Sequence, residues 1–411
     1  MTMPQTRHYE MKVSGFGDIR EMPKHWQMLR IKNRYSVLCG ATPSENSENW
    51  DGDINWIGPA DMGDFGKIKE GKRTITQTGY DSCGTHLIPA GSVILSTRAP
   101  IGKVQIAEAE LCTNQGCKSM VRMFTDDSTQ FLAYYLFAIK ERLQEAGTGT
   151  TFKELSTANL KNMPFLLPSP QEQTAIAAYL DEKCATIDAI VTEAKATIDE
   201  YKAWKASVIS EIVTKGLNPN AEMKDSGVEW IGEIPKGWKI KAAKYCVEIH
   251  HGSDPVTEGD VPVYGSGADS FKTCGEYKEG PAVLVGRKGA TLHIPHYIIG
   301  RYWNVDTAFD VKAHPDFSLK FYYYLAICFD YKFYISQTTL PGMTQTNYRN
   351  MPIPVPPLSE QASIVSYLDR KCSLIDGIIL EKEELIKELE HYKALIEMYA
   401  CPYLDTEYSD K

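Results

Sequence analysis

The sequence predicts an α+β chain in which two similar mixed α/β domains are joined by two long helices. Residues 159–191 align without a gap with residues 347–379, and 16 of the 33 aligned pairs are identical. A second repeat lies upstream of each copy, where residues 10–26 match residues 222–238. After the first repeat, apolar residues recur about every 3.5 positions, which is typical of a coiled-coil seam. We therefore expect the helices to pack as an antiparallel coiled coil, with a pseudo-two-fold relation between the halves.

Composition fits a globular protein of two or more domains. The chain has 411 residues, of which 43% are hydrophobic and 24% charged, as is ordinary for such proteins. No apolar run is long enough to span a membrane, and residues 1–7 lack the apolar segment of a signal peptide, so we expect a cytoplasmic protein. The ten cysteines form no CxxC pairs of the kind found in zinc sites, and no metal site is expected.

Charge is distributed unevenly along the chain. The net charge of −9 argues weakly against a nucleic-acid ligand. The acidic excess, however, lies in residues 170–215 and 358–411, whereas residues 1–169 and 216–357 are nearly neutral. Each nearly neutral segment can still carry a local basic face. The acidic helical segments are better suited to a protein partner than to phosphate.

Each long helix is predicted to begin where prolines stop the preceding strand. The first spans residues 169–215 and the second residues 357–400. Ser169 and Ser359 are candidates to cap these helices, and Gly216 is expected to end the first. At about 1.5 Å per residue, each helix would be roughly 65 Å long.

Two lysines occupy equivalent positions in the seams of these helices. Lys205 and Lys393 are 188 residues apart, which is also the offset between the repeats. Two unrelated amphipathic helices would not explain this match, and a polar seam residue fixes register at a cost in stability. The other predicted seam residues are Ala177, Leu180, Cys184, Ile187, Val191, Ala194, Ile198, Tyr201, Val208 and Ile212 in the first helix, and Val365, Leu368, Cys372, Ile375, Ile379, Lys382, Ile386, Leu389 and Ile396 in the second.

The segments outside the helices are predicted to be domains. The first covers residues 1–168, and the second, with a linker, covers residues 216–356, while residues 401–411 form a tail. Short buried strands are expected at 93–97 and 282–285, because apolar runs there are bounded by Gly, Pro, Asn and Asp. Helices rich in Tyr and Phe are expected at 129–144 and 319–334, with their rings in the core rather than stacked on bases.

Signatures of catalysis are absent from the sequence. It contains no Walker A loop, GxSxG, HExxH or paired CxxC motif, and no Asn-Pro-Pro-Tyr/Phe stretch of an adenine methyltransferase. Glu276 and Lys278 resemble the end of a metal-nuclease motif but lack its upstream Pro-Asp. Three interpretations remain open. The chain is a non-catalytic reader of DNA, a methyltransferase or nuclease with an unrecognised site, or a coiled-coil scaffold with two protein-binding modules.

Polar and basic residues near the predicted strands favour DNA recognition. Arg98 and Arg287 fall at corresponding places after a strand, where an Arg on a turn can reach guanine O6 and N7. Residues 147–153 and 337–345 are polar segments between elements, where binding loops usually lie. A structural role stays open for each. The candidate DNA-binding residues are Arg98, Lys103, Thr148, Thr150, Thr151, Lys153, Arg287, Lys288, Thr338, Thr339, Thr344 and Gln345.

The whole pattern resembles the specificity subunit of type I restriction–modification systems, over nearly the entire chain. Residues 216–238 are similar to the family's inter-module segment, and residues 172–188 and 360–376 resemble its two helical regions. Gly40-x-Thr42-Pro43, with Trp50 and Asp51 downstream, and Val261-Pro262-Val263-Tyr264-Gly265-Ser266-Gly267 resemble the starts of its target-recognition domains.

The resemblance implies a division of labour between subunits. Each domain would read one half of a bipartite site in double-stranded DNA, and the helices would set the spacer and dock two modification subunits. This chain would be non-catalytic and bind no cofactor. S-adenosylmethionine would belong to the modification subunits, and ATP and Mg would serve restriction subunits in defence against foreign DNA. The candidate residues for helix register or partner docking are Tyr179, Leu180, Lys205, Tyr367, Leu368 and Lys393.

Overall fold

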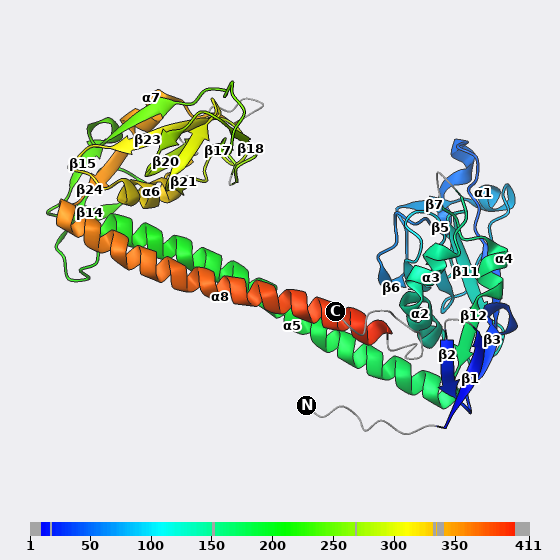
Figure 1. Cartoon of the computed structure of the whole chain (residues 1–411). Helices are drawn as coiled ribbons and strands as arrows, with labels where there is room; N and C mark the ends of the chain where they lie inside the picture. The colour runs from blue at the N-terminus through cyan, green and yellow to red at the C-terminus, as the bar shows by residue number, and fades with distance from the viewer. Residues whose placement is uncertain are drawn as a thin grey trace. The chain divides into compact units, whose positions relative to one another are not determined.

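The computed structural model describes residues 10–16, 19–149, 153–267, 269–331, 334 and 341–398 (Figure 1). The chain divides into two compact units. Unit 1 comprises Met1–Thr192 and Ile386–Lys411, and unit 2 comprises Glu193–Leu385. Each unit contains a mixed α/β domain together with part of α5 (Pro170–Lys215) and part of α8 (Leu358–Met398). The predicted α+β fold class is confirmed.

The larger sheet of unit 1 has five strands and carries the core. Buried β8 (Val93–Ser96) lies at its centre, and α2 (Thr129–Ala138) packs on β8 and β9 (Val104–Ala107) through a continuous apolar cluster. The order is β4 (Tyr35–Cys39), β11 (Cys117–Arg122), β8 (Val93–Ser96), β9 (Val104–Ala107) and β6 (Phe65–Ile68). A second sheet has the order β10 (Cys112–Thr113), β5 (Trp50–Ile57) and β7 (Arg73–Ile75). The two-stranded sheets are β1 (Met11–Phe16) with β2 (Ile19–Pro23), and β3 (Gln27–Arg30) with β12 (Pro164–Leu167). The helices are α1 (Gln77–Asp81), α2 (Thr129–Ala138), α3 (Lys140–Glu145) and α4 (Thr157–Asn162).

Unit 2 is built in the same way. Its buried strand β20 (Ala282–Gly286) is covered by α6 (Leu319–Cys328), whose apolar side chains join the core of this unit. The larger sheet has the order β16 (Val247–His251), β23 (Ala308–Ala313), β20 (Ala282–Gly286) and β21 (His296–Ile298). The second sheet has the order β18 (Lys272–Cys274), β17 (Val261–Tyr264), β22 (Arg301–Asn304) and β19 (Lys278–Glu279). The two-stranded sheets are β13 (Met223–Asp225) with β14 (Glu233–Pro235), and β15 (Lys239–Ala242) with β24 (Pro352–Val355). The helices are α6 (Leu319–Cys328) and α7 (Gln345–Asn350).

Strand pairing shows how the two units correspond. The order β16-β23-β20-β21 repeats β4-β11-β8-β9, and the parallel pair β17 and β22 repeats the parallel pair β5 and β10. Among the described residues, β6 at the edge of β9 has no counterpart at the edge of β21. The second half of the chain is shorter than the first mainly between β17 and β20. The corresponding stretch of unit 1, between β5 and β8, holds β6 and α1.

The predicted strands are confirmed by β8 and β20, whereas both aromatic helices are shorter than predicted. The helix expected at 129–144 is interrupted at Ile139, where the backbone leaves helical geometry between α2 and α3. The helix expected at 319–334 ends at Cys328, because Phe329 has an extended backbone. The prediction that the rings belong to the core holds for α2 and α6, since Phe131, Tyr135 and Tyr322 are fully buried.

The ends of the long helices follow local hydrogen-bonding rules. Ser169 caps α5: its Oγ accepts from the Glu172 amide at 3.3 Å, and the Glu172 carboxylate accepts from the Ser169 amide at 3.1 Å. The predicted cap at Ser359 is wrong, because α8 begins at Leu358 and the Pro357 carbonyl accepts the first helical amides. Gly216 ends α5 with a φ of +74°, as glycine readily does.

The predicted coiled-coil seam is confirmed over most of its length. The buried seam residues are Ala177, Leu180, Cys184, Ile187, Val191, Ala194 and Ile198 in α5, and Leu368, Cys372, Ile375, Ile379, Ile386 and Ile396 in α8. Near the end of α5 the burial shifts by one residue, so Ile209 and Val213 are buried and Val208 and Ile212 only half-buried. The shift occurs because this turn also packs on the residues around Trp238.

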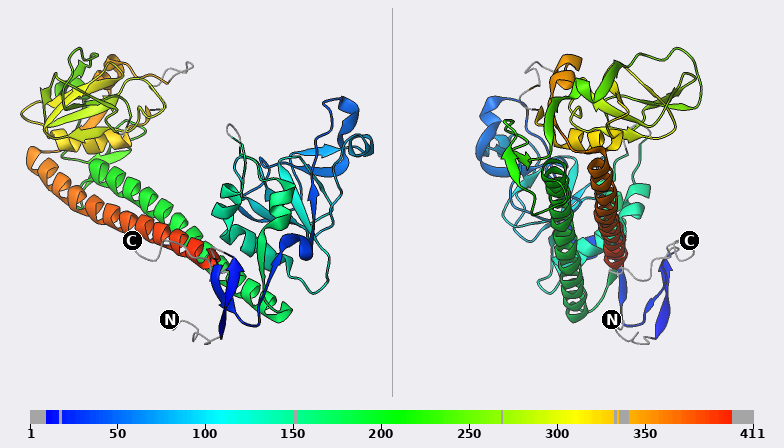
Figure 2. Two further views of the ribbon diagram at one scale, coloured as in Figure 1. Left: turned by 45° about the vertical axis from the view of Figure 1, so that its right-hand side comes forward. Right: turned by 90° about the vertical axis from the view of Figure 1, so that its left-hand side faces the viewer.

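In each unit the two helix segments run antiparallel, and a lysine of one segment forms an ion pair with an aspartate of the other. In unit 2 the Lys205 ammonium lies 2.7 Å from both carboxylate oxygens of Asp376. In unit 1 the Lys393 ammonium lies 2.6 and 2.7 Å from those of Asp188. Figure 2 shows these segments side by side from two further directions. None of the described helices is long and apolar enough to cross a membrane.

Candidate nucleic-acid interface

A buried glutamine at the start of each long helix fastens the domain to it. Gln173 accepts from the Ser128 amide at 2.9 Å and donates to the Pro168 carbonyl at 3.1 Å. Gln361 repeats both bonds in unit 2, with the Ser318 amide at 2.7 Å and the Pro356 carbonyl at 3.0 Å. Ser128 and Ser318 are the N-caps of α2 and α6, so each glutamine links two helix starts.

The glutamates beside these glutamines hold a tryptophan from the upstream repeat. Trp26 Nε1 donates to Glu172 at 3.5 Å, and Trp238 Nε1 donates to Glu360 at 2.9 Å. Partial burial disfavours the charged form of Glu172, but hydrogen bonds from His25, Ser169 and Trp26 outweigh it, so its pKa lies below the usual glutamate value. Burial and hydrogen bonding of this kind favour a fixed contact between the upstream repeat, which carries the tryptophan, and the start of the long helix, which carries the glutamate.

About two turns further along each long helix, an aspartate accepts a hydrogen bond from a tyrosine hydroxyl of the domain. Tyr134 donates to Asp181 at 2.8 Å, and Tyr324 donates to Asp369 at 2.7 Å. We call the repeated glutamate, glutamine, aspartate and their partners the frame. The frame accounts for much of the sequence repeat, because the repeated polar residues seat each domain on its helices.

The ends of β8 and β20 mark the candidate DNA-contacting corners, and here the predicted alignment is off by one residue. The Thr97 amide donates to the Gly116 carbonyl and the Arg287 amide to the Thr307 carbonyl, both at 2.7 Å. Backbone bridges pair Arg98 with Glu154 and Lys288 with Gly342. Arg98 therefore corresponds to Lys288, and Arg287 corresponds to Thr97.

We call Arg98, Gln115, Lys118, Thr148 and Glu154 the unit 1 corner. They line a polar cavity of about 490 Å³. Arg98 Nε donates to Glu154 Oε2 at 3.0 Å, and the Lys118 ammonium lies 3.6 Å from Glu154 Oε1. Lys118 is 2% exposed, whereas the Arg98 and Glu154 side chains are 47% and 39% exposed. The corner thus presents an arginine and a carboxylate to a ligand above a buried cation.

We call Arg287, Lys288, Asp306, Phe309 and Gly342 the unit 2 corner, the counterparts by strand register of Thr97, Arg98, Gln115, Lys118 and Glu154. Arg287 donates through Nη1 to Asp306 Oδ2 at 3.0 Å, and Lys288 is exposed. Phe309 is buried and packs against His251 with ring centroids 5.0 Å apart. An aromatic ring and a glycine thus replace the buried lysine and the carboxylate of unit 1.

A glycine lets the strand next to each corner approach the neighbouring loop. A side chain at Gly40 would overlap the carbonyl oxygen of Asn114, and one at Gly252 would overlap that of Val305. These glycines occupy equivalent ends of β4 and β16. The close approach positions the loops that carry Gln115 and Asp306.

The remaining candidate DNA-binding residues have different structural roles. The Lys103 ammonium donates to the carbonyls of Pro59 and Met62 at 3.1 and 2.7 Å. Thr344 caps α7, and Gln345 Nε2 donates to the Ile249 carbonyl at 2.6 Å. Lys153 is exposed. Thr150, Thr151, Thr338 and Thr339 lie outside the described residues.

The helix candidates fall on two different surfaces. Leu180 and Leu368 are buried in the seam, at 2% and 0% exposure. Tyr179 is exposed, and Tyr367 is half-buried against the core of unit 2. Lys205 and Lys393 form the ion pairs between the helix segments.

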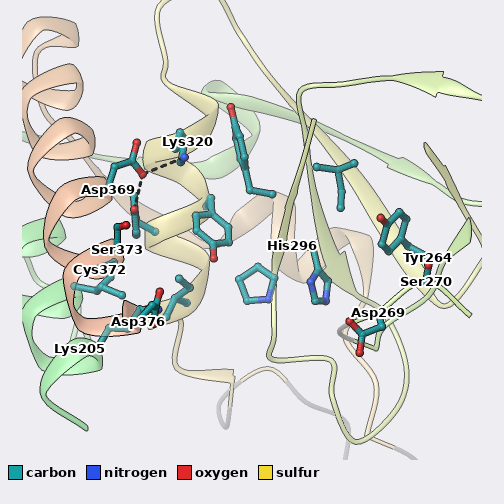
Figure 3. Close-up of a pocket in the computed structure, with 17 residues that line it drawn as sticks. Lys205, Tyr264, Asp269, Ser270, His296, Lys320, Asp369, Cys372, Ser373 and Asp376 are labelled. Carbon is teal, nitrogen blue, oxygen red and sulfur yellow. Dashed lines mark hydrogen bonds and ion pairs between the residues drawn. The ribbon is translucent and has the colours of Figure 1, made fainter. Parts of the chain in front are cut away.

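A larger cavity, of about 710 Å³, lies in unit 2 between the domain and its helix segments (Figure 3). Asp369 lies on one side, where it accepts from Tyr324 and pairs with the Lys320 ammonium at 3.0 Å. His296 lies on the other side, and burial lowers its pKa below the usual histidine value, although the Asp269 carboxylate and a hydrogen bond with the Gly267 backbone oppose this shift. The cavity mixes both signs of charge, and its lysines are paired with carboxylates of α8.

Sequence reasoning missed Lys118, Glu154 and Asp306. These residues come from β11 and two loops and meet the predicted arginines only in the folded sheet. Glu154 directly follows the polar segment 147–153, which was the one local signal. Glu276 and Lys278 do not act together, because Glu276 accepts from the amides of Val256 and Thr257 while Lys278 binds Asn304 and Asp310. No group of three or more metal-binding side chains occurs in the part of the chain that the structure describes.

Comparisons with known proteins agree with this architecture. The family model described as the type I restriction modification DNA specificity domain matches residues 23–200 and 235–391. The chain is 33% identical over 247 residues to the type I restriction enzyme MjaIX specificity subunit of Methanocaldococcus jannaschii, covering 58% of this chain and 55% of that protein. The match thus spans about half the length of that curated relative.

Two solved structures share the fold. One is a chain from work on the structural basis of complex assembly and conformational transition of the type I R-M system, with a TM-score of 0.73, 17% identity and coverage of 92% of this chain and 98% of that one. The other is the HsdS subunit of Thermoanaerobacter tengcongensis, with a TM-score of 0.58, 17% identity and coverage of 92% and 97%. The family resemblance of the sequence is confirmed, and the chain belongs to the type I restriction modification DNA specificity domain family.

Proposed function

We propose that this chain is the subunit that reads the DNA sequence for a type I restriction–modification complex. The observation that carries the proposal is a common frame bearing two unlike corners. Arg98 and Glu154 face the ligand in unit 1, and Lys288 with the Arg287–Asp306 pair does so in unit 2. Each unit reads one half of a bipartite site in double-stranded DNA, and the two half-sites differ because the corners differ. The chain itself catalyses no reaction and binds no cofactor.

The helices set the spacer between the half-sites and dock two modification subunits. Support comes from apolar side chains that remain exposed on α5 and α8 beside acidic residues, a composition suited to a protein interface. These side chains include Trp204, Leu374, Leu380 and Tyr392. The modification subunits supply S-adenosylmethionine and methylate adenine, and restriction subunits supply the chemistry that depends on ATP and Mg.

The test is the genome-wide pattern of adenine methylation in a host that expresses this chain with its modification subunit. We expect a bipartite methylated motif that disappears when the gene for this chain is deleted. A complex that assembles but produces no such motif would exclude the proposed function and favour a scaffold. Turnover by the chain alone, with S-adenosylmethionine or Mg and DNA, would exclude the non-catalytic role.

The spacer role has its own test. Insertion of one heptad into both α5 and α8 keeps the seam in phase and lengthens the helices by about 10 Å. We expect the spacer in the methylated motif to lengthen or methylation to be lost. Methylation of the original motif after this insertion would show that the helices do not set the spacer.

A further inference from the structure

We propose that Arg98 and Glu154 together read one G·C base pair through the major groove. This inference rests on the proposed DNA-reading function and deepens it, because it names the base pair that the unit 1 corner selects. The two side chains are held in place, their hydrogen-bonding groups match one base pair, and unit 2 lacks the arrangement.

The backbone of Glu154 is fixed from both sides. Its amide donates to the Thr148 carbonyl at 2.9 Å, and its carbonyl accepts from the Thr148 amide at 3.0 Å. On the other side Glu154 forms a bridge with Arg98, and the next amide, of Leu155, donates to the Thr97 carbonyl at 2.9 Å. Glu154 therefore occupies a strand-like position between two chain segments, although it lies in a connection between α3 and α4.

The carboxylate of Glu154 is held by two cations. Arg98 donates to one oxygen at 3.0 Å, and the Lys118 ammonium lies 3.6 Å from the other. Lys118 also donates to the Thr97 hydroxyl at 3.0 Å, so its ammonium is fixed below the corner. The three side chains carry a formal net charge of +1, and the exposed carboxylate therefore does not make the corner repel DNA. Preorganised groups of this kind lose little freedom when they bind.

The hydrogen-bonding groups of the pair are complementary to G·C. In the major groove, guanine presents the acceptors N7 and O6, and cytosine presents the donor N4. Within the described residues, both Nη atoms of Arg98 form no other hydrogen bond, so they can donate to guanine. The Glu154 oxygens have further lone pairs that can accept from cytosine N4. An A·T pair presents an acceptor, a donor and another acceptor in that order, which an arginine followed by a carboxylate does not match.

The other unit does not contain this pair. Gly342 takes the place of Glu154, Phe309 takes the place of Lys118, and Lys288 takes the place of Arg98. A lysine is a compact point charge without the two-pronged geometry of a guanidinium. The arginine–carboxylate reading is therefore expected in the half-site of unit 1 only.

The test uses the complete modification complex with the variant Glu154→Gln. The methylated motif is determined for the variant and for the wild type in the same host. We expect one G·C pair in one half-site to become permissive, with the preference for G·C falling about 10- to 100-fold, while the other half-site is unchanged. The matched control is Glu10→Gln, which removes an exposed glutamate of the same unit that pairs with Lys24. An unchanged motif in Glu154→Gln would overturn the proposal.

A second variant separates specificity from folding. Glu154→Gln leaves the buried Lys118 ammonium without its carboxylate, which destabilises a protein. The double variant Lys118→Met/Glu154→Gln removes that buried charge and should recover the melting temperature while the motif stays relaxed. Recovery of the wild-type motif along with the melting temperature would show that Glu154 acts only through stability, and would overturn the proposal.

The DNA side gives an independent result with the wild-type protein. Replacing each guanine of the motif in turn by 7-deazaguanine removes the N7 acceptor without altering the protein. We expect one substitution to weaken binding of the wild-type complex about tenfold and to have little effect on the Arg98→Ala complex, which no longer donates to guanine N7. If no guanine of either half-site behaves in this way, the proposal is overturned. A wild-type complex without a bipartite motif would instead overturn the proposed function itself.

Discussion

Unit 1 and unit 2 differ at the edge of their larger sheets. In unit 1, β6 pairs with β9, and Phe65 packs on Tyr134 and Phe137 with ring centroids 4.7 and 5.1 Å apart. In unit 2, the corresponding β21 borders the cavity of about 710 Å³, and Tyr324, the counterpart of Tyr134, lines it. Both tyrosines nevertheless donate to the equivalent aspartate of a long helix. The frame contact thus does not depend on how the space beside it is filled.

The corners differ as strongly as the edges do, whereas the frame is the same in both units. Gln173 and Gln361 make equivalent hydrogen bonds, although Glu154 is matched by Gly342. Buried polar groups must keep their hydrogen-bond partners, so exchange at the frame is costly. Exposed positions are not constrained in this way. The comparison predicts similar sensitivity of the two units at the frame and dissimilar sensitivity elsewhere.

The largest effect is expected from Gln173→Leu and Gln361→Leu. Each change leaves a buried amide and a buried carbonyl without a partner, at about 1–3 kcal/mol each, so the free energy of unfolding of the affected unit should fall by about 2–5 kcal/mol. Amide hydrogen exchange at Ser128 and Ser318 reports on each unit separately. The exposed Gln171→Leu is the control and should change little. Unequal losses in the two units would break the equivalence of the frame.

An intermediate effect is expected from Phe65→Ala. The half-buried ring loses its contacts with Tyr134 and Phe137, and unit 1 should lose about 2 kcal/mol of unfolding free energy. The same truncation at Phe271, which is 60% exposed in unit 2, should cost little. Thermal unfolding of the whole chain measures both. An unchanged unfolding free energy after Phe65→Ala would show that unit 1 does not need the packing at its sheet edge, just as unit 2 folds without a counterpart of β6 among its described residues.

The smallest effect is expected from the ion pairs between the helix segments. Double-mutant cycles to alanine should give a coupling energy of about 0.5 kcal/mol for Lys205 with Asp376, and the same for Lys393 with Asp188, because both aspartates are more than half exposed. The coupling should weaken as salt is added. Lys24 with Glu10, an exposed pair outside the helices, provides the baseline. Couplings that differ between the two helix pairs would show that the seams are not equivalent.

The fold was largely predictable, because the sequence features that specify it are periodic or repeated. Heptads and proline stops are local signals, and they placed α5 and α8 within a residue or two of their observed ends. Local signals also explain the error at Ser359, since Pro357 lies close enough to begin the helix two residues earlier than a serine cap allows. The aspartate partners of Lys205 and Lys393 were visible in the repeat, but pairing them requires the register of two helices that are far apart in sequence.

The corners were predictable only in part. Two arginines after two strands look equivalent, but the backbone hydrogen bonds place Arg98 opposite Glu154 and Arg287 one position earlier. A shift of one residue in an extended segment reverses the direction of the side chain. Lys118 could not be selected at all, because in sequence it is an ordinary strand lysine, and only the sheet places it under Glu154.

The reciprocal ion pairs bear on the ancestry of the chain. The first half of the chain contributes Asp188 and Lys205, and the second half contributes Asp376 and Lys393. Each half of the chain therefore carries both the lysine and the aspartate of the ion pairs, which is the pattern of an isologous contact between identical molecules. A gene encoding one repeat would have specified a product that pairs with itself, and duplication followed by fusion would have preserved that pairing while the two copies diverged at their exposed corners.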